Sequence, residues 1–575
     1  MQAYETSGPL PETPGRPTPW LKLAGAILRK QVGAELFGMP GYRLTLKGRA
    51  PDGFLAAPHD GRPASALIGK AIMSGRFTLA GGRMSVQGSG DPWNRPSPSR
   101  AFAVELHRFA WLSSLMSQGD EGAREAVRLF LLWQRTFRDW TPFTWGEEVL
   151  PRRLINLSLF ARRMAAQASP DEVVVFAQSL AEQGRHLRRL GQNPAHETRK
   201  AVALSILGCV LSGRVGDGFR NAGLRLLPKA LKRSILPDGA PVSRSPEQAL
   251  ELLYDLLLVE DGLSQRGMAV PEIIETYVVR LTRFIRAMSH PDGSLVAFQG
   301  TESLLEDQVA PALVRVEARP DDHQPSVLEH GRFHRLTGRS LSVFVDSGEP
   351  RPGPFGYAAC DHPMAFEVSG GRDKLIVTPG WSPDQSEHQA FRIAAAANTL
   401  TLGDGVILSP MSGRWGDMLD FGLDGPRYKI RSRRVEAEDS GTLLEMEHEG
   451  WKPAWSLKHE RRLYVDAHRD ELRGEERLTP LETKAKVLQT APFTVRFLLH
   501  PEVQASLARD KKSVLLRGPG GRGWWLRHDA PGVTLHPGTV FEKGVARKTA
   551  AIVLTGTAQP GQVTRVRWKL SPAEA

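Results

Sequence analysis

Two tryptophans flank a short polar loop that has the right side chains to contact carbohydrate. Trp140 and Trp145 bracket the stretch WTPFTWGEE, in a chain that holds 13 tryptophans beside seven tyrosines. An exposed indole combines a flat apolar face, which stacks on a sugar ring, with a polar N–H group. We expect these two residues to form a sugar-stacking platform. Trp133, Trp524 and Trp525 fall in helical or strand stripes and are expected in the core.

Metal and nucleotide chemistry find little support in the sequence. The two cysteines, Cys209 and Cys360, lie far apart and have no partners at metal-ligand spacing, which excludes a disulfide framework and a cysteine zinc site. The Gly-rich stretch LRGPGGRG is not followed by a helical pattern, so it is expected to be a hairpin loop and not a phosphate-binding loop. No nucleotide cofactor is therefore expected.

Length and composition indicate a large globular protein of several domains. The chain has 575 residues, of which 41% are hydrophobic and 24% charged. No run approaches the ~18 consecutive apolar residues of a transmembrane helix, so no transmembrane segment is expected. The N-terminal stretch MQAYETSGPLPETPGRPTPW is polar and Pro-rich and lacks the pattern of a signal peptide. The sequence therefore favours the cytoplasm.

The chain is basic, with 75 Lys and Arg residues against 63 Asp and Glu residues and a net charge of +12. An excess of this kind favours polyanionic partners, such as an acidic polysaccharide or an anionic membrane surface. The charge is spread without a Lys/Arg block, so a simple solvated surface remains an equal alternative. No nucleic-acid-binding motif is present, and no nucleic-acid partner is expected.

The middle of the chain has the apolar spacing of helices. From about residue 101 to 306, seven or more helical stretches are joined by short linkers, so neighbouring helices must run antiparallel as helical hairpins. Pro-Asp-Gly precedes a polar stretch and a helix twice, in LPDGAPVSRSPEQAL and HPDGSLVAFQGTESL. A repeated turn at the end of a hairpin favours a closed (α/α) toroid over an open bundle.

The last third changes to short alternating runs separated by Gly, Pro and Asp turns, a pattern typical of an antiparallel β-sandwich of a dozen or more strands. The expected class is α+β and multidomain. Residues 1–100 are expected to be an N-terminal extension that includes a small hairpin around Phe77 to Leu79. Residues 101–318 are expected to form the toroid and residues 319–575 the sandwich.

Several stretches resemble the heparinase II/III family of polysaccharide lyases, along nearly the whole chain. In the β half they are AFEVSGGRDKLIVTPGW, HQAFRIAAAANTLTLGD and LKHERRLYVDAHRDELRGEERL, and in the helical half ELHRFAWL, RRLINL and HPDGSLVAFQG. The likeness is greatest to alphaproteobacterial members that lack secretion signals. The resemblance implies a toroid followed by a sandwich, and cleavage of uronate-containing acidic glycans by β-elimination.

This reaction needs a group that neutralises the uronate carboxylate, a base for the C5 proton and an acid for the leaving oxygen. The resemblance assigns the first role to Asn193 in LGQNPAHETRK. The position of the family's tyrosine holds Gln248, which cannot act as acid or base, and Tyr254 is expected in the core. The family's histidine beside the asparagine is replaced by Pro194, which leaves His196 as the candidate base.

The family's zinc site is also altered. Where zinc-binding members carry their histidine and aspartate ligands, this chain has AACDHPMAF, Thr378 and Ala397, so the resemblance implies no zinc and no other cofactor. Asp361 and His362 remain in that segment. Either His362 supplies the missing base or acid, or the two residues form a structural pair that holds the loop.

Polar residues that recur among the alphaproteobacterial members are candidates for substrate binding. Arginine guanidinium groups match carboxylates and sulfates with two parallel hydrogen bonds, so Arg244, beside Glu247 and after a Pro-Asp-Gly turn, is expected at the mouth of the toroid. Arg153 and Asn156, one helical turn apart, either bind substrate or brace adjacent hairpins, with bracing slightly favoured.

Three functions remain open on the sequence. The first is a lyase acting on an acidic polysaccharide or oligosaccharide. The second is a degenerate glycan-binding or scaffold protein of the same fold, which Gln248, Pro194 and Ala397 would permit. The third is a glycoside hydrolase with paired carboxylates chosen from Asp238, Glu247 and Glu197. The family's substrates favour the periplasm or cell envelope, against the cytoplasm that the N-terminus indicates.

Overall fold

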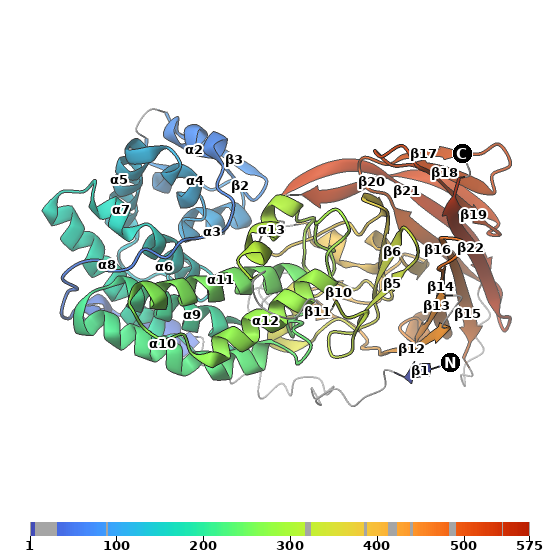
Figure 1. Cartoon of the computed structure of the whole chain (residues 1–575), viewed down its shortest axis with the longest axis horizontal. Coiled ribbons are helices and arrows are strands. Elements are labelled where there is room, and N and C mark those ends of the chain that lie inside the picture. Colours follow the sequence, from blue (N-terminus) through green and yellow to red (C-terminus); the bar gives the residue numbers. More distant parts are fainter. Residues whose placement is uncertain are drawn as a thin grey trace.

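The computed structural model confirms the expected fold class, an (α/α) helical toroid followed by an antiparallel β-sandwich (Figure 1). It describes residues 2–5, 31–87, 90–191, 193–316, 324–384, 388–411, 422–437, 441–481, 490–542 and 544–573. The expected boundary between residues 318 and 319 lies outside these ranges. None of the helices within them is long and apolar enough to cross a membrane.

The helical half consists of short and long helices joined by tight connections. They are α2 (Ala66–Met73), α3 (Arg100–Arg108), α4 (Leu112–Met116), α5 (Gly119–Phe137), α6 (Leu150–Leu159), α7 (Ala161–Ala165), α8 (Pro170–Arg189), α9 (Pro194–Val210), α10 (Gly213–Ser234), α11 (Pro246–Gln265), α12 (Glu272–Ala287) and α13 (Glu306–Val314). Polar N-caps followed by proline begin α8, α9 and α11, because a side-chain oxygen there accepts a free backbone N–H while proline needs none.

Helix α10 is absent from the sequence-based expectation. It contains several glycines and an internal proline, Pro228, which weaken a helical signal. Tertiary packing outweighs this local preference: a Cβ on Gly208 of α9 would lie 2.1 Å from the backbone nitrogen of Arg220 in α10. The two helices therefore form a hairpin so close that only glycine fits at the contact.

The repeated Pro-Asp-Gly turns have the same geometry. Gly239 and Gly293 both have φ 86°, and each turn is closed by an isolated β-bridge, Ile235 with Pro241 and Ser289 with Leu295. Asp238 in the first turn accepts a hydrogen bond from Gly331 N at 2.7 Å, at the start of the β half. The first turn thus ties a helical hairpin end to the sandwich.

The β half contains three larger sheets in the described part of the chain. The nine-stranded sheet runs in the order β1 (Gln2–Glu5), β12 (Ile430–Ala437), β13 (Gly441–His448), β14 (Leu457–Asp466), β15 (Glu471–Pro480), β22 (Thr564–Pro572), β19 (Gly523–His528), β18 (Ser513–Arg517) and β17 (Gln504–Leu507). The five-stranded sheet runs in the order β4 (Val327–Leu328), β5 (Phe333–Thr337), β6 (Leu341–Asp346), β7 (Phe366–Gly370) and β8 (Asp373–Ile376). The four-stranded sheet runs in the order β20 (Gly532–Glu542), β21 (Val545–Ala558), β16 (Ala491–Leu498) and β9 (Leu400–Leu402). Burial alternates along β14, as expected for a strand with one face in the core.

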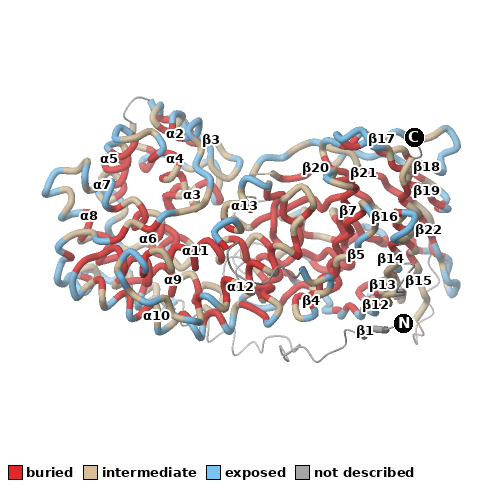
Figure 2. The backbone as a smooth tube through the Cα atoms, in the orientation of Figure 1, coloured by how far each residue is buried: buried red, intermediate tan, exposed pale blue. Residues whose placement is uncertain are grey.

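The described segment before α3, apart from strand β1, packs with the helical half. The expected hairpin is confirmed as β2 (Arg76–Leu79) and β3 (Gly82–Ser85). Phe77 from this hairpin packs edge-on against Trp111, and Trp93 stacks near Phe109. These side chains belong to the same buried core as the toroid, so residues 54–100 fold onto it and do not stand apart (Figure 2).

The two halves share a hydrophobic core. The core of the toroid continues into Phe333, Phe344 and Ala365 of the β half, and the rings of Phe298 and Phe333 stack with centroids 5.9 Å apart. A second core fills the space between the sheets. The junction is therefore fixed by packing, and it positions residues from both halves around one cleft.

Candidate functional site

A cleft with a cavity volume of about 80 Å³ lies where the toroid meets the β half. Helices α6, α9 and α11 supply one wall, and the loops around Gly300, residues 353–357 and residues 382–384 supply the other. The lining side chains that can donate or accept hydrogen bonds are Arg152, Thr198, Arg199, Ser234, Ser243, Glu247, Gln248, Glu251, Asp255, Tyr357, Ser382 and Asp384. This is the expected place for a toroid site, at the ends of the hairpins.

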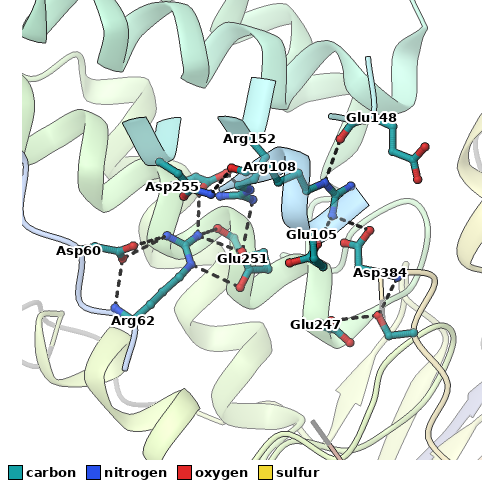
Figure 3. Close-up of polar contacts among 12 residues, drawn as sticks. Asp60, Arg62, Glu105, Arg108, Glu148, Arg152, Glu247, Glu251, Asp255 and Asp384 are labelled. Carbon is teal, nitrogen blue, oxygen red and sulfur yellow. Dashed lines mark hydrogen bonds and ion pairs between the residues drawn. The ribbon is translucent and has the colours of Figure 1, made fainter. Parts of the chain in front are cut away.

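Along one wall of the cleft, arginines are held by carboxylates of the chain itself (Figure 3). Asp255 accepts from Arg152 Nη1 and from Arg62 Nη2, both at 2.7 Å, and Glu251 lies 3.0 Å from Arg62. Burial alone would raise the pKa of Asp255, but the charges of Arg152 and Arg62 hold it below its usual range. Both guanidinium groups are thus already engaged with anions.

A second ion pair joins the two halves beside the cleft. Asp384, from the β half, lies 3.0 Å from Arg108 at the end of α3, and Glu105 lies 2.9 Å from the same guanidinium. Burial would raise the pKa of Asp384, yet the charges of Arg108 and Arg199 lower it to about 2. Asp384 is therefore ionised at neutral pH and fixes its loop to the toroid (Figure 3).

The pKa of Glu247 is shifted in the opposite direction to that of Asp384. Its Oε1 accepts from Ser382 Oγ at 3.0 Å and its Oε2 from Glu302 N at 3.1 Å. Burial and the neighbouring carboxylates Glu302 and Asp384 raise its pKa well above the usual range. No cation is bonded to it among the contacts of the described residues, so its surroundings favour the neutral form of the carboxyl group.

Glu302 lies behind Glu247, buried at the junction, where its Oε2 accepts from Gly544 N at 2.8 Å. Burial raises its pKa from 4.5 to about 7. The folded chain therefore binds this proton more tightly than the unfolded chain does. The free energy of unfolding should fall as the pH rises from 4.5 to about 7 and stay low above that.

The variant Glu302→Gln should accordingly raise the free energy of unfolding at pH 8 by about 1–3 kcal/mol, because it removes a buried charge. At pH 4.5, where the native side chain is protonated, the difference should largely vanish. Urea unfolding at both pH values measures this. The exposed Glu306, 59% of whose side chain is accessible, gives the control Glu306→Gln, which should change stability by less than ~0.5 kcal/mol. Equal stability of the native chain and Glu302→Gln at pH 8 would contradict the raised pKa.

The residues assigned to the neutralising group and the base lie at the edge of the cleft. Asn193 is the N-cap of α9, and its Oδ1 accepts from Ala195 N at 3.2 Å. In the following turns Ala195, Thr198 and Arg199 line the cleft, whereas His196 lines a smaller hollow of about 10 Å³ beside it. The His196 ring centroid is 6.1 Å from that of Tyr357, which lines the cleft itself.

Arg244 lies elsewhere than expected. It is buried, with its guanidinium paired with Asp346, donating to Gly331 O at 2.9 Å and lying 4.7 Å from the centre of the Phe333 ring. Its backbone has φ 66°, and its side chain contacts Gly331, Phe333 and Asp346 of the β half. The structure thus corrects the expectation of a substrate clamp: Arg244 holds the two halves together.

His362 and Asp361 are buried within the β half. His362 Nε2 contacts Phe391 O at 2.9 Å, and burial lowers its pKa to about 4. Asp361 accepts from Tyr428 Oη at 2.6 Å and Leu408 N at 2.9 Å, and burial raises its pKa to about 6. Neither residue lines the cleft, and both are bonded to neighbouring segments of the β half.

The remaining candidates also lie outside the cleft. Trp145 is buried and donates to Phe137 O at 3.0 Å, and Trp140 packs near Phe37 with ring centroids 5.9 Å apart, so the two do not form a shared platform. Arg153 is buried, donates to Thr144 O at 2.7 Å and lies over Trp133, and Asn156 donates to Arg108 O at 2.9 Å. These contacts fit the role favoured from the sequence for Arg153 and Asn156, which is to brace adjacent hairpins.

Of the carboxylates considered for hydrolysis, Glu247 alone reaches the cleft among the described residues. Glu197 pairs with Arg233 at 2.8 Å, and Asp238 accepts from Ala240 N and Gly331 N in its turn. Tyr254 is buried and donates to Gln308 O at 2.8 Å, as expected of a core residue.

At the positions of the altered zinc ligands, Thr378 Oγ1 lies 2.6 Å from both Glu367 Oε1 and Ala297 O, and Ala397 is buried. Glu367 also contacts His290 Nε2 at 2.8 Å. Across the described ranges, no group of three or more His, Cys, Asp or Glu residues could hold a metal ion. The side chains of Thr378, Glu367 and His290 are instead hydrogen-bonded to one another and to the backbone in this region.

Sequence reasoning missed several residues that line the cleft, among them Arg199, Tyr357, Ser382 and Asp384. It also missed Arg62 and Arg108, which pair with the lining carboxylates Asp255 and Asp384. Arg62 belongs to the segment taken as an extension, and Asp384 follows the strand-turn motif TPGW. The one local signal was the motif RRLIN, in which the neighbouring Arg152, and not Arg153, faces the cleft.

Comparisons with known proteins agree with this architecture. The family model described as "Heparinase II/III-like, C-terminal" matches residues 320–569. FtsZ-localized protein C of Caulobacter vibrioides is 40% identical over 565 residues, covering 96% of this chain and 97% of its own. The crystal structure of heparinase III superposes with a TM-score of 0.69 at 13% identity, covering 97% of this chain and 92% of that one. Heparan sulfate lyase HepC of Pedobacter heparinus gives a TM-score of 0.53 at 15% identity, covering 97% of this chain and 91% of that one.

Proposed function

Because the chain belongs to the heparinase II/III-like family, we propose that it uses the lyase fold without lyase chemistry, as a non-catalytic protein that associates with FtsZ. The observation that carries this proposal is the 40% identity to FtsZ-localized protein C along almost the whole of both chains. Identity of this extent, without large gaps in coverage, supports a shared role more strongly than a fold likeness at 13% identity does.

The chemistry of the cleft supports the same conclusion. A lyase must offer a cationic or amide group to the uronate carboxylate, and two arginines at or beside the cleft, Arg152 and Arg108, are instead paired with carboxylates of the chain. Gln248 carries an amide, which cannot act as a general acid or base. The proposal locates the chain in the compartment that holds FtsZ, in agreement with the cytoplasmic expectation.

Imaging in cells tests the association. A fluorescent fusion of the full chain should form the same foci or bands as FtsZ, and depletion of FtsZ should disperse it. Substitutions of the cleft residues Gln248 and Tyr357 by alanine should leave this pattern unchanged, since no cleft chemistry is needed. A fusion that stays diffuse while FtsZ forms its normal structures would contradict the proposal.

A specific observation favours a second function, cleavage of an acidic glycan. Tyr357 lines the cleft close to His196, and a phenol and an imidazole are the groups that β-elimination uses as acid and base, with Asn193 one turn away to neutralise the carboxylate. Under this alternative, incubation with acidic polysaccharides should produce the ultraviolet absorbance of unsaturated uronate, and Tyr357→Phe and Asn193→Ala should abolish it. We expect no such absorbance from the native chain.

A further inference from the structure

The outer face of the nine-stranded sheet carries a cluster of cations on three neighbouring strands, β15, β22 and β19. On β22 the side chains of Val566, Trp568 and Leu570 are buried in the core, so the residues between them point outward. The outward cations of the three strands, called the cationic face below, are Arg473, Arg477, Arg565, Arg567, Lys569 and Arg527. These strands lie at the end of the molecule farthest from the helices and from the cleft (Figure 1).

Like charges lie directly opposite one another within the cationic face. Arg477 on β15 pairs with Arg565 on β22. Lys569 on β22 lies between Arg473 on β15 and Arg527 on β19. Side chains at directly opposite positions have Cβ atoms ~4.5–5.5 Å apart, and like charges at this distance destabilise a sheet. Because the arrangement lowers the stability of the sheet, it favours a role for these cations in contacts with another molecule.

The outward carboxylates of these three strands, Glu471 and Glu475, are recessed beneath the cations. Their side chains are 12% and 18% accessible, whereas those of Arg565 and Arg567 are 51% and 57% accessible. Glu475 lies 3.8 Å from Arg565 and 4.0 Å from Arg567, which is too far for a hydrogen bond. Neither guanidinium group donates a hydrogen bond to a residue that the structure describes, so both can bind an external carboxylate with two parallel bonds.

The other carboxylates nearby do not cancel this excess of cations. Glu471 serves two cations at once, Arg473 at 3.0 Å and Lys569 at 3.1 Å. Asp529, just beyond the end of β19, lies 3.7 Å from Arg567. The next strand, β14, carries equal numbers of outward cations and carboxylates, namely Lys458, Arg462, Glu460 and Asp466. The positive charge is therefore concentrated on β15, β22 and β19.

The geometry of the face fits an acidic polypeptide. Outward side chains on β22 follow one another every ~6.6 Å, which is also the spacing of alternate side chains along an extended segment. Such a segment brings amide N–H groups to the recessed Glu471 and Glu475 together with carboxylates for the arginines. A phosphate polymer or an anionic lipid surface would place further negative charge over these two carboxylates.

We propose that the cationic face is a docking surface for an extended acidic polypeptide segment, whose carboxylates bind Arg565 and the cations beside it. This surface lies apart from the cleft. It goes beyond the proposed function, which names FtsZ as a partner but assigns no surface of this chain to any partner.

Fluorescence anisotropy of a labelled glutamate decamer, titrated with the full chain at near-physiological ionic strength, tests the surface. The double variant Arg565→Glu with Lys569→Glu should weaken binding at least tenfold, because it places two carboxylates within the face. Each new carboxylate lies opposite an arginine, Arg477 in one case and Arg473 and Arg527 in the other. The variant should therefore remain folded, with a thermal unfolding temperature no lower than that of the native chain.

The matched control is Lys229→Glu with Lys232→Glu on exposed positions of α10, which changes the net charge by the same amount. It should bind the decamer as the native chain does. An equal loss in both double variants overturns the proposal, because overall charge would then account for binding. Native affinity in the folded Arg565→Glu and Lys569→Glu variant also overturns it, as does an absence of binding by the native chain.

Two competing probes test the class of partner. They are vesicles that contain phosphatidylglycerol and a single-stranded oligonucleotide. We expect the native chain to bind the decamer more tightly than either probe. Tighter binding of the vesicles or the oligonucleotide, lost in the Arg565→Glu and Lys569→Glu variant, overturns the assignment to a polypeptide. Imaging of the fusion with FtsZ decides the separate question of the FtsZ association.

Discussion

Replacing Asp346 with alanine should lower the free energy of unfolding by about 3–5 kcal/mol, because it leaves the buried Arg244 cation without its counter-charge. Both side chains are 1% accessible, and Asp346 also accepts from Gln299 Nε2 at 2.8 Å and from Gly348 N at 3.0 Å. The pair joins the start of α11 to the end of β6, so its loss loosens the junction that shapes the cleft.

Urea unfolding at pH 7 measures this loss. Glu449→Ala is the matched control, since it breaks an exposed ion pair with Lys452 and should cost less than about 1 kcal/mol. Asp346→Asn should also destabilise the chain, since it retains the shape but not the charge. A cost below about 1 kcal/mol for both variants of Asp346 would show that Arg244 is held by packing alone.

Replacing Glu476 with glutamine should have a similarly large effect, about 3–5 kcal/mol at pH 7. Glu476 lies fully buried on β15, where its carboxylate is 2.8 Å from Arg461, 2.7 Å from His459 Nε2 and 3.3 Å from Trp568 Nε1. Arg461 in turn donates to Met364 O and Asn398 O, both at 2.7 Å, so the pair connects the large sheet to the loops inside the sandwich.

The effect of Glu476→Gln should depend on pH in a defined direction. Burial alone would raise the pKa of the Glu476 carboxyl, but the charges of Arg461 and His459 lower it from 4.5 to about 2. Its contribution is therefore complete above pH 4.5 and is lost as the pH falls toward 2. The difference between the native chain and the variant should shrink over that range.

Unfolding curves at pH 7 and pH 3 test the prediction. The neighbouring residue Glu475 has its side chain on the opposite, outer face of β15, near Arg462 and Arg565. Glu475→Gln is thus a control on the same strand and should cost less than about 1 kcal/mol. A difference for Glu476→Gln that is the same at both pH values would refute the lowered pKa.

The architecture could be predicted from the sequence because apolar residues have helical spacing in one half and alternate along strands in the other. Apolar spacing identified the long helices, and the turns at Gly239 and Gly293 indicated repeated hairpin ends. Helix α10 was missed because Pro228 and its glycines hide a helix that packing against α9 stabilises. Local preference decides most elements, and tertiary contact decides the exceptions.

The site was less predictable, since it depends on pairings between distant parts of the chain. Glu247 and the helix begun by Asn193 do border the cleft, but Arg108 meets Asp384 and Arg62 meets Asp255 only in the folded chain. The position of Arg244 after a turn indicated an exposed mouth, whereas its side chain is buried and paired with Asp346 of the β half. Which arginine is free and which is neutralised cannot be read from composition or spacing.

The stacked rings of Phe298 and Phe333 have a consequence for how the protein can be divided. The family model begins at residue 320, but the apolar core that contains Phe298 continues through Phe333 and Phe344 beyond that point. A fragment cut there would expose apolar surface on both pieces to water, which favours aggregation. The residues that the family model matches are therefore not a separate packing unit, because they share a core with the helical half.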